Sequence, residues 1–162
     1  MIEMAKWFIM KKRRNALSRP SWHEIFTEAT VLFSKRSSCV KAQQAALLIK
    51  DNRIISFGIN GSPAGHINCS EHSEAICGKD SNGSCFLGIH AEQNAIGYAA
   101  RNGINTDGCI VYCTQSPCIS CAKLVVAAGI KEFYYISNYR LVDGIKFLEQ
   151  AGVSIKRIKN DS

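Results

Sequence analysis

The sequence has no hydrophobic run that approaches the length of a membrane span. A transmembrane helix needs about 20 consecutive apolar residues, and the apolar stretches of this 162-residue chain are much shorter. The chain also lacks the order of a signal peptide, because the basic residues 11–14 follow the apolar residues 1–10 instead of preceding them. We therefore expect a protein without membrane contact that is located in the cytoplasm.

Acidic residues are the scarcer charged class. The chain has 13 Asp and Glu against 20 Lys and Arg, a formal net charge of +7, which favours anionic partners such as nucleotides or nucleic acid. Much of the excess lies near the termini, in residues 11–14 and at Lys156, Arg157 and Lys159. Aromatic and basic residues do not alternate as they do in proteins that stack single-stranded bases, so a nucleic-acid partner is the less favoured choice.

The length fits a single domain that can bury a sizeable core. An apolar content of 46% and a charged content of 20% are ordinary for a globular protein. We expect residues 1–20 to form a basic extension, either exposed or packed on a neighbouring subunit, and residues 21–162 to form one domain.

Local patterns predict a helix and then a hairpin in the first third of that domain. Ser21 and Glu24 have the spacing of a capping box at a helix start. Apolar residues then recur at helical spacing and predict one core-facing side: Trp22, Ile25, Phe26, Ala29, Leu32 and Phe33. Two apolar runs, residues 45–50 and 53–57, flank Asp51-Asn52, which is a tight hairpin signal.

Helices and strands are expected to alternate through the second half of the chain. The patterns predict helices at residues 90–101, 118–128 and 142–150, and strands at residues 109–114, 130–136 and 153–158. Strand-helix-strand repeats call for parallel pairing with right-handed crossovers, beside one antiparallel hairpin. The predicted fold class is therefore α/β, with a five-stranded mixed sheet between helical layers in three layers, α/β/α.

Two short motifs carry recognisable chemistry: His-x-Glu, with His90 and Glu92, and Pro-Cys-x-x-Cys, with Cys118 and Cys121. One imidazole and two thiolates are ligands that Zn²⁺ prefers, and three protein ligands leave a fourth position open for water, as in catalytic zinc sites. Glu92 is close enough to handle the protons of that water. Cys-x-x-Cys alone would also suit a redox pair or half of a structural zinc site.

The long irregular stretch of residues 66–89 needs something to hold it in a compact domain. A second, four-ligand structural zinc would supply that constraint. The candidate ligands are cysteines outside the first site: Cys39, Cys69, Cys77 and Cys85. His72 could replace Cys77, and the alternative is that these are scattered free thiols.

These segments resemble the deoxycytidylate (dCMP) deaminases of the zinc-dependent cytidine deaminase superfamily. The resemblance covers roughly residues 21–158, and its segments follow one another in the family's order: residues 34–39, 58–63, 90–96 and 117–123. His-x-Glu followed by Pro-Cys-x-x-Cys is the established pattern of zinc deaminases. The Asn-Gly-Ser-Pro loop and the Cys-rich insertion resemble the dCMP branch more narrowly.

The resemblance implies a cytidine-deaminase-like fold and hydrolytic deamination of dCMP to dUMP and ammonia. It assigns the catalytic zinc to His90, Cys118 and Cys121, and proton transfer to Glu92. The substrate-binding residues expected on the same basis are Asn60, Arg36, Ser37, Ser116, Tyr139 and Arg140. It also implies hexamers, and activation by dCTP with Mg²⁺ bound near Asn60 and Gly61.

Two segments depart from the family's usual pattern. The chain has Gln44-Ala45-Ala46 where the family usually has Val-Gly-Ala at the entry to the first strand, and Ile59 where it usually has Tyr. We expect the loss of the aromatic residue at position 59 to bear on the ligand repertoire and on dCTP regulation, and to leave catalysis intact.

Two other functions stay open from the sequence. A deaminase of a base in nucleic acid, such as tRNA adenosine or single-stranded DNA cytosine, needs an extended groove and room for a flipped base. A non-catalytic, zinc-stabilised nucleic-acid-binding module would have no use for Glu92 beside an open metal position.

Overall fold

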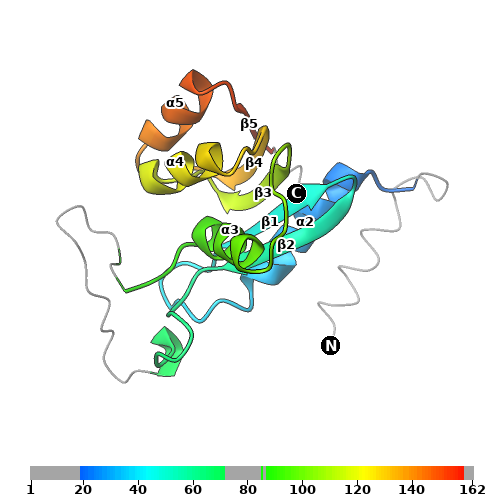
Figure 1. Ribbon diagram of the computed structural model, residues 1–162. Coiled ribbons are helices and arrows are strands. Elements are labelled where there is room, and N and C mark those ends of the chain that lie inside the picture. The colour runs from blue at the N-terminus through cyan, green and yellow to red at the C-terminus, as the bar shows by residue number, and fades with distance from the viewer. Residues whose placement is uncertain (1–18, 72–84, 86, 159–162) are drawn as a thin grey trace.

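The fold is built on a five-stranded sheet with the strand order β2-β1-β3-β4-β5 (Figure 1). The computed structural model describes residues 19–71, 85 and 87–158. The strands are β1 (Ala45–Lys50), β2 (Arg53–Ile59), β3 (Ile110–Gln115), β4 (Glu132–Ser137) and β5 (Ser154–Arg157). β1 is antiparallel to both β2 and β3, whereas β3–β4 and β4–β5 are parallel pairs. The predicted five-stranded mixed sheet is confirmed.

The hairpin of β1 and β2 forms where the sequence predicts it. Asp51 and Asn52 have φ values of 50° and 57°, the left-handed conformation of a two-residue type I′ turn. The antiparallel register then pairs Ala45 with Ile59 at the far end of the hairpin. The residues just outside these strand ends, Gln44 and Asn60, consequently lie side by side, and the Asn60 N–H donates to the Gln44 carbonyl at 3.1 Å.

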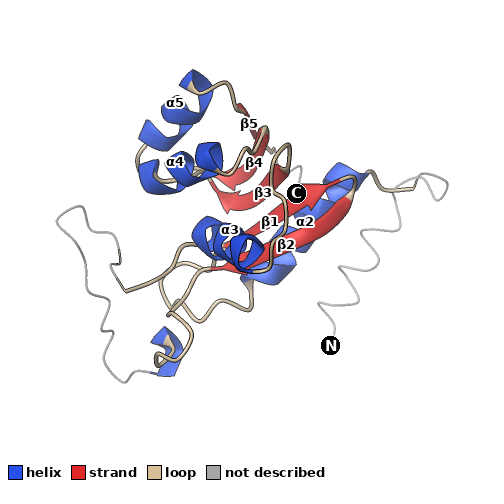
Figure 2. Cartoon of the chain, viewed as in Figure 1, coloured by secondary structure: helices blue, strands red, loops and turns tan. Residues whose placement is uncertain are grey.

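Helices cover both faces of the sheet, with α2 on one face and α3, α4 and α5 on the other (Figures 1 and 2). Their bounds are α2 (Trp22–Ser34), α3 (Ala91–Arg101), α4 (Ile119–Ala127) and α5 (Asp143–Gln150). Successive strand residues point to opposite faces: Leu47 and Ile49 pack with Phe26 of α2, whereas Leu48 and Val111 pack on the other side. The three-layer α/β/α arrangement is confirmed.

The predicted core-facing side of α2 is wrong in part. Trp22, Ile25 and Leu32 are 49%, 38% and 64% exposed. The helix instead buries two threonines beside Phe26. Their hydroxyl groups donate to helix carbonyls, Thr27 to His23 and Thr30 to Phe26, both at 2.7 Å. A hydroxyl satisfied by its own helix can be buried at low cost, so apolar spacing alone did not identify the buried side.

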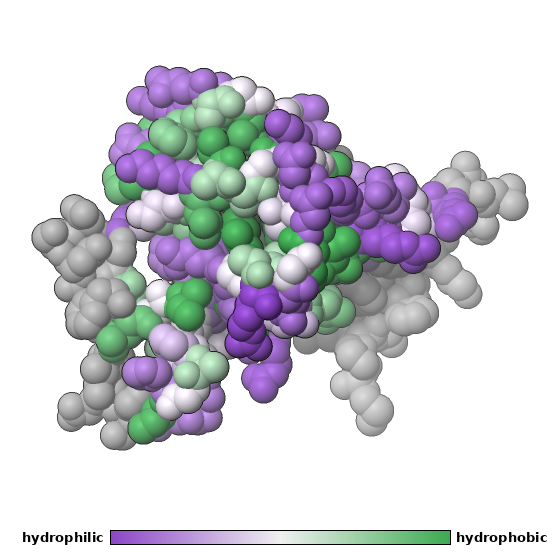
Figure 3. Space-filling view, in the orientation of Figure 1, coloured by the Kyte–Doolittle hydropathy of each residue, from purple (hydrophilic) through white to green (hydrophobic). Residues whose placement is uncertain are grey.

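Some predictions lie outside the described residues. These are most of the N-terminal extension, Cys77 and His72. The basic extension and the domain boundary at residue 20 therefore stay predictions. None of the helices in the described part combines the length and the apolar content that a membrane span requires. On the face drawn in Figure 3, hydrophobic residues reach the surface in several patches among hydrophilic ones.

The contact between β2 and α3 depends on Gly58. A Cβ atom at this position would collide with the backbone of Ala91 and Ala95, which are both buried on α3. Backbone cannot move aside as a flexible side chain can, so this close approach requires glycine. The start of α3 is thereby held directly against the sheet.

We expect Gly58→Ala to lower the free energy of unfolding by about 1–3 kcal/mol, as overpacking of a close contact does. The matched control is Gly97→Ala on the exposed side of α3, where a Cβ meets nothing within 4 Å. That change should be neutral or stabilise the protein by up to about 1 kcal/mol, since alanine favours helix. Urea unfolding of both variants measures the difference, and equal stabilities would contradict the close-contact argument.

Candidate active site

The candidate site lies where two helices begin. His90 is the N-cap residue of α3 and Cys118 is the N-cap residue of α4, both with extended backbone. The Gln93 side chain accepts the backbone N–H of His90 at 2.9 Å. The Cys121 N–H lies 3.5 Å from the Cys118 sulfur. A helix N-terminus stabilises negative charge through its unpaired N–H groups and its dipole, so it favours a thiolate at Cys118.

The three predicted metal ligands meet at this point. The His90 Nδ1 atom lies 3.5 Å from the Cys118 sulfur and 3.4 Å from the Cys121 sulfur. All three ligand atoms lie within 4.8 Å of one another, and within the described residues they are the only such group. Zinc–nitrogen and zinc–sulfur bonds of about 2.0 and 2.3 Å at tetrahedral angles place nitrogen and sulfur about 3.5 Å apart. The donor set and its spacing therefore fit Zn²⁺.

The three groups of the cluster change one another's pKa values. A hydrogen bond from Cys121 lowers the pKa of the Cys118 thiol to about 4, and the hydrogen bond with His90 adds to this effect. The contact with Cys118 raises the pKa of His90. The same thiol–thiol contact and burial raise the pKa of Cys121. The cluster thus concentrates negative charge on sulfur, as a cation site requires.

Glu92 lies in the first turn of α3 and is only 7% exposed. Burial raises the pKa of its carboxyl to about 7, although the charge on His90 acts in the opposite direction. A carboxyl with a pKa near neutrality can both accept and donate a proton at neutral pH. The group of ligand atoms does not include Glu92, so the carboxyl lies beside the metal position without being one of its predicted ligands, and the Cys121 thiol is hydrogen-bonded to it.

A pocket of about 270 Å³ opens over this cluster. It brings together most of the predicted site residues, because its lining includes His90, Glu92, Cys118, Asn60, Gly61, Ser116, Tyr139 and Arg140. Arg36 is exposed and does not line it, and Ser37 is buried behind Asn60. The lining also includes Lys41 and Gln44, which sequence reasoning did not select. Both follow the polar segment 34–39, and no local pattern distinguishes them from surface residues.

Asn60 joins three parts of the pocket wall. Its side-chain Oδ1 accepts the Ser37 hydroxyl at 2.6 Å and the Gln44 N–H at 2.8 Å. Its Nδ2 donates to the Ala42 carbonyl at 2.7 Å. Asn60 therefore holds the segment before β1 against the end of β2, whatever contact it also makes with a ligand.

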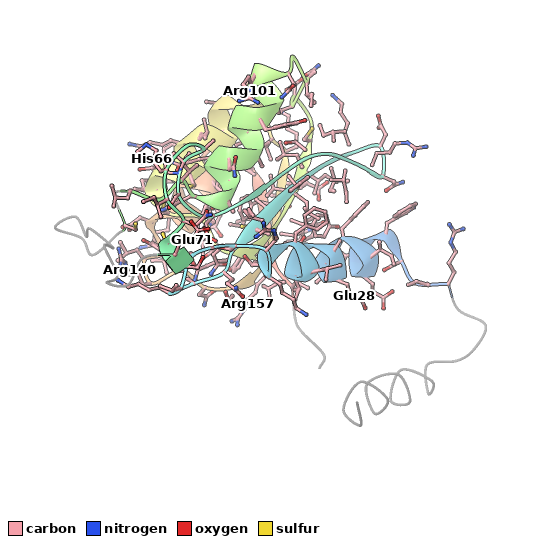
Figure 4. All side chains as sticks on the ribbon, turned by 90° about the horizontal axis from the view of Figure 1, so that it is seen from below. Glu28, His66, Glu71, Arg101, Arg140 and Arg157 are labelled. Atoms are coloured by element: carbon pink, nitrogen blue, oxygen red, sulfur yellow. The ribbon has the colours of Figure 1, made fainter. Side chains whose placement is uncertain are left out.

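The opposite wall comes from the ends of β3 and β4. The Ser116 hydroxyl accepts the Tyr139 N–H at 2.7 Å, and the Arg140 guanidinium lies over the Tyr139 ring at 5.2 Å. Lys41 and Arg140 are both exposed, whereas Glu92 is buried, so the cations lie at the mouth of the pocket. In Figure 4, Arg140 and Glu71 lie toward the same end of the molecule. Arg101, the last residue of α3, lies at the opposite end.

Three of the four cysteines predicted for a second zinc line the same pocket. Cys39, Cys69 and Cys85 are half-buried free thiols, and the Ser62 hydroxyl lies 3.4 Å from the Cys69 sulfur. Within the part of the chain that the structure describes, these three sulfur atoms do not all lie within 4.8 Å of one another. The second zinc stays a prediction.

Comparison with known proteins agrees with this geometry. Residues 20–137 match the family described as the cytidine and deoxycytidylate deaminase zinc-binding region, a span that includes the three predicted ligands of the catalytic zinc and Glu92. The chain belongs to this family. ComE operon protein 2 of Bacillus subtilis is 36% identical over 146 residues, 90% of this chain and 75% of the relative.

Two further proteins that are similar to this chain have names that state their substrate. Deoxycytidylate deaminase of Schizosaccharomyces pombe is 36% identical over 146 residues, which span 86% of this chain and 44% of that protein. The crystal structure of dCMP deaminase from the cyanophage S-TIM5, in complex with dCMP and dUMP, superposes with a TM-score of 0.75 at 36% identity. That match covers 87% of this chain and 99% of the phage chain.

Proposed function

We propose that this member of the zinc-dependent deaminase family hydrolyses dCMP to dUMP and ammonia. The observation that carries the proposal is the buried Glu92 carboxyl beside the His90, Cys118 and Cys121 cluster, at the inner end of a pocket with cations at its mouth. The similarity to the cyanophage enzyme that was crystallised with dCMP and dUMP supports this substrate.

The proton transfers fall to Glu92. His90, Cys118 and Cys121 would hold Zn²⁺, which would supply Lewis acidity that lowers the pKa of water toward neutrality. The Glu92 carboxylate accepts a proton from the attacking water and donates it to N3 of the pyrimidine. As the C4–O bond forms and the C4–N bond breaks, the carboxyl passes the second water proton to the leaving amine, which departs as ammonia.

The mouth of the pocket suits a 5′-phosphate. Lys41 and Arg140 are exposed cations on its lining, and both can donate hydrogen bonds to phosphate oxygens. A pocket of about 270 Å³ has the scale of a single small ligand, which favours a mononucleotide over a base in a polynucleotide. The hexamer, the structural zinc and dCTP–Mg²⁺ binding near Asn60 and Gly61 stay predictions.

Ammonia release from a substrate panel tests the proposed function. The purified protein is incubated with dCMP, CMP, dCTP, deoxycytidine, a tRNA and a single-stranded DNA, each with and without added dCTP. We expect dCMP to have the highest kcat/KM and deoxycytidine, without the phosphate that Lys41 and Arg140 would bind, a much lower one. Faster deamination of a polynucleotide than of dCMP would reject the assignment.

Replacing Glu92 with Gln should separate proton transfer from metal binding. Because general acid–base catalysis contributes about 10²–10⁴-fold, we expect Glu92→Gln to lower kcat on dCMP by at least that factor. Zinc content should be unchanged, since the carboxyl is not among the ligand atoms. Gln93→Glu is a matched control, because its carboxylate keeps the acceptor for the His90 N–H. Normal turnover in Glu92→Gln would rule out the mechanism.

A second zinc predicts two metal ions in each chain. Because a structural zinc contributes to folding, Cys85→Ser should reduce the zinc content from two to one and lower the melting temperature. Cys109→Ala, at a buried cysteine that lies outside the pocket lining, should keep both ions. Metal analysis by mass spectrometry decides the matter, and a parent protein with one zinc in each chain would remove the second site.

A further inference from the structure

Gln44 has a fixed position in the pocket wall. It is half-buried and lies immediately before β1. Its backbone N–H donates to the Asn60 Oδ1 at 2.8 Å, and its carbonyl accepts the Asn60 N–H at 3.1 Å. These hydrogen bonds to the backbone N–H and carbonyl restrict the backbone of Gln44. The starting position of its side chain in the pocket wall is therefore fixed.

Thr114 fixes the orientation of the Gln44 side-chain amide. The Thr114 hydroxyl oxygen accepts the Ala45 N–H at 3.1 Å. Its own proton has two acceptors within reach, the Gln44 Oε1 and, at the longer distance of 3.4 Å, the Ala45 carbonyl. The oxygen of the amide is therefore turned toward Thr114, and the nitrogen is turned away from it. A hydroxyl has only one proton to donate, and the contact with Gln44 is the shorter of the two. With the amide oxygen paired in this way, the amide nitrogen is the end left over.

The amide nitrogen of Gln44 is available to a ligand. It has no hydrogen-bond partner among the described residues, where every buried side-chain nitrogen or oxygen has one. The nitrogen is therefore not fully buried, and Gln44 is part of the pocket lining. Two N–H donors on a held amide form a preorganised contact for an acceptor, which costs little side-chain entropy on binding.

The position of Gln44 along the sheet places this donor near the inner end of the pocket. Ala46, two residues further on, pairs with Cys113 of β3. Cys113 and Glu92 both line the pocket, as Gln44 does. Gln44 is thus close to the part of the wall that borders Glu92, whereas Lys41 and Arg140 are exposed at the mouth.

We propose that Gln44 is a specificity-determining residue whose amide N–H donates to the C2 carbonyl oxygen of the pyrimidine. This inference rests on the proposed function. The cytosine ring offers two acceptors, N3 and the C2 oxygen, and N3 receives its proton from Glu92. Adenine has no carbonyl, so it would leave the donor unpaired, and sites built to hydrogen-bond a group discriminate strongly against analogues that lack it.

A double-mutant cycle between protein and substrate tests the contact. Gln44→Met keeps the length of the side chain and removes both donors, and 2-thio-dCMP replaces the oxygen acceptor with sulfur, a weaker one. We expect Gln44→Met to lower kcat/KM about tenfold on dCMP, the upper range for a neutral hydrogen bond, and less than threefold on 2-thio-dCMP. The control is Gln150→Met, at an exposed residue at the end of α5, which should match the parent on both substrates.

Variants of Thr114 test the orienting hydroxyl. Thr114→Ser retains the hydroxyl and should retain parent kinetics. Thr114→Val removes the hydroxyl, so we expect it to lower kcat/KM on dCMP by a smaller factor than Gln44→Met does. The double variant should lose no more kcat/KM than Gln44→Met alone. Melting temperatures identify any loss that comes from unfolding, because Thr114→Val also removes the acceptor for the Ala45 N–H.

Each outcome has a defined meaning. An equal loss on dCMP and 2-thio-dCMP, or no loss on either in folded Gln44→Met, would overturn the contact while leaving the proposed function in place. A parent protein that releases no ammonia from dCMP would overturn the proposed function and this inference together. The parent measurement therefore distinguishes the two failures.

Discussion

The site depends on the contact between two helix starts. α3 begins after His90 and α4 begins after Cys118, so an imidazole and a thiol occupy N-cap positions at neighbouring helix ends. Both helices rest on the same face of the sheet through a shared hydrophobic core. The sheet thereby sets the separation of the helix starts, and the ligand atoms lie within 4.8 Å of one another because of that packing.

The same packing buries Glu92 and makes its chemistry possible. Gly58 allows β2 to approach the backbone of α3 closely, and this approach leaves little room for solvent around the first turn. Burial of a carboxyl costs free energy, which is expressed in the raised pKa of Glu92. The near-neutral pKa of the Glu92 carboxyl is therefore a consequence of how tightly α3 packs on the sheet.

Features that depend on local sequence were predictable, and those that depend on tertiary packing were not. Asp51-Asn52 specifies its own turn, and the spacing of Cys118 and Cys121 specifies a shared helix start. The exposure of Leu32 was not predictable, because α2 buries Thr27 and Thr30, whose hydroxyl groups are satisfied by carbonyls of their own helix. Lys41 and Gln44 carry no local pattern either; they reach the pocket only because the ends of β1 and β2 are tied together at Asn60.

The residues that we propose for catalysis and those that we propose for recognition consequently lie in segments that are held in different ways. The zinc ligands and Glu92 belong to helix starts that the core holds, whereas Gln44 and Arg140 belong to segments outside the strands that side-chain hydrogen bonds hold, such as those of Asn60 and Ser116. A change in such a segment can alter ligand contacts without moving the metal cluster. A polar residue at the entry of β1 is therefore compatible with an unchanged reaction centre, and the effect that we propose for Gln44 falls on which base the pocket accepts.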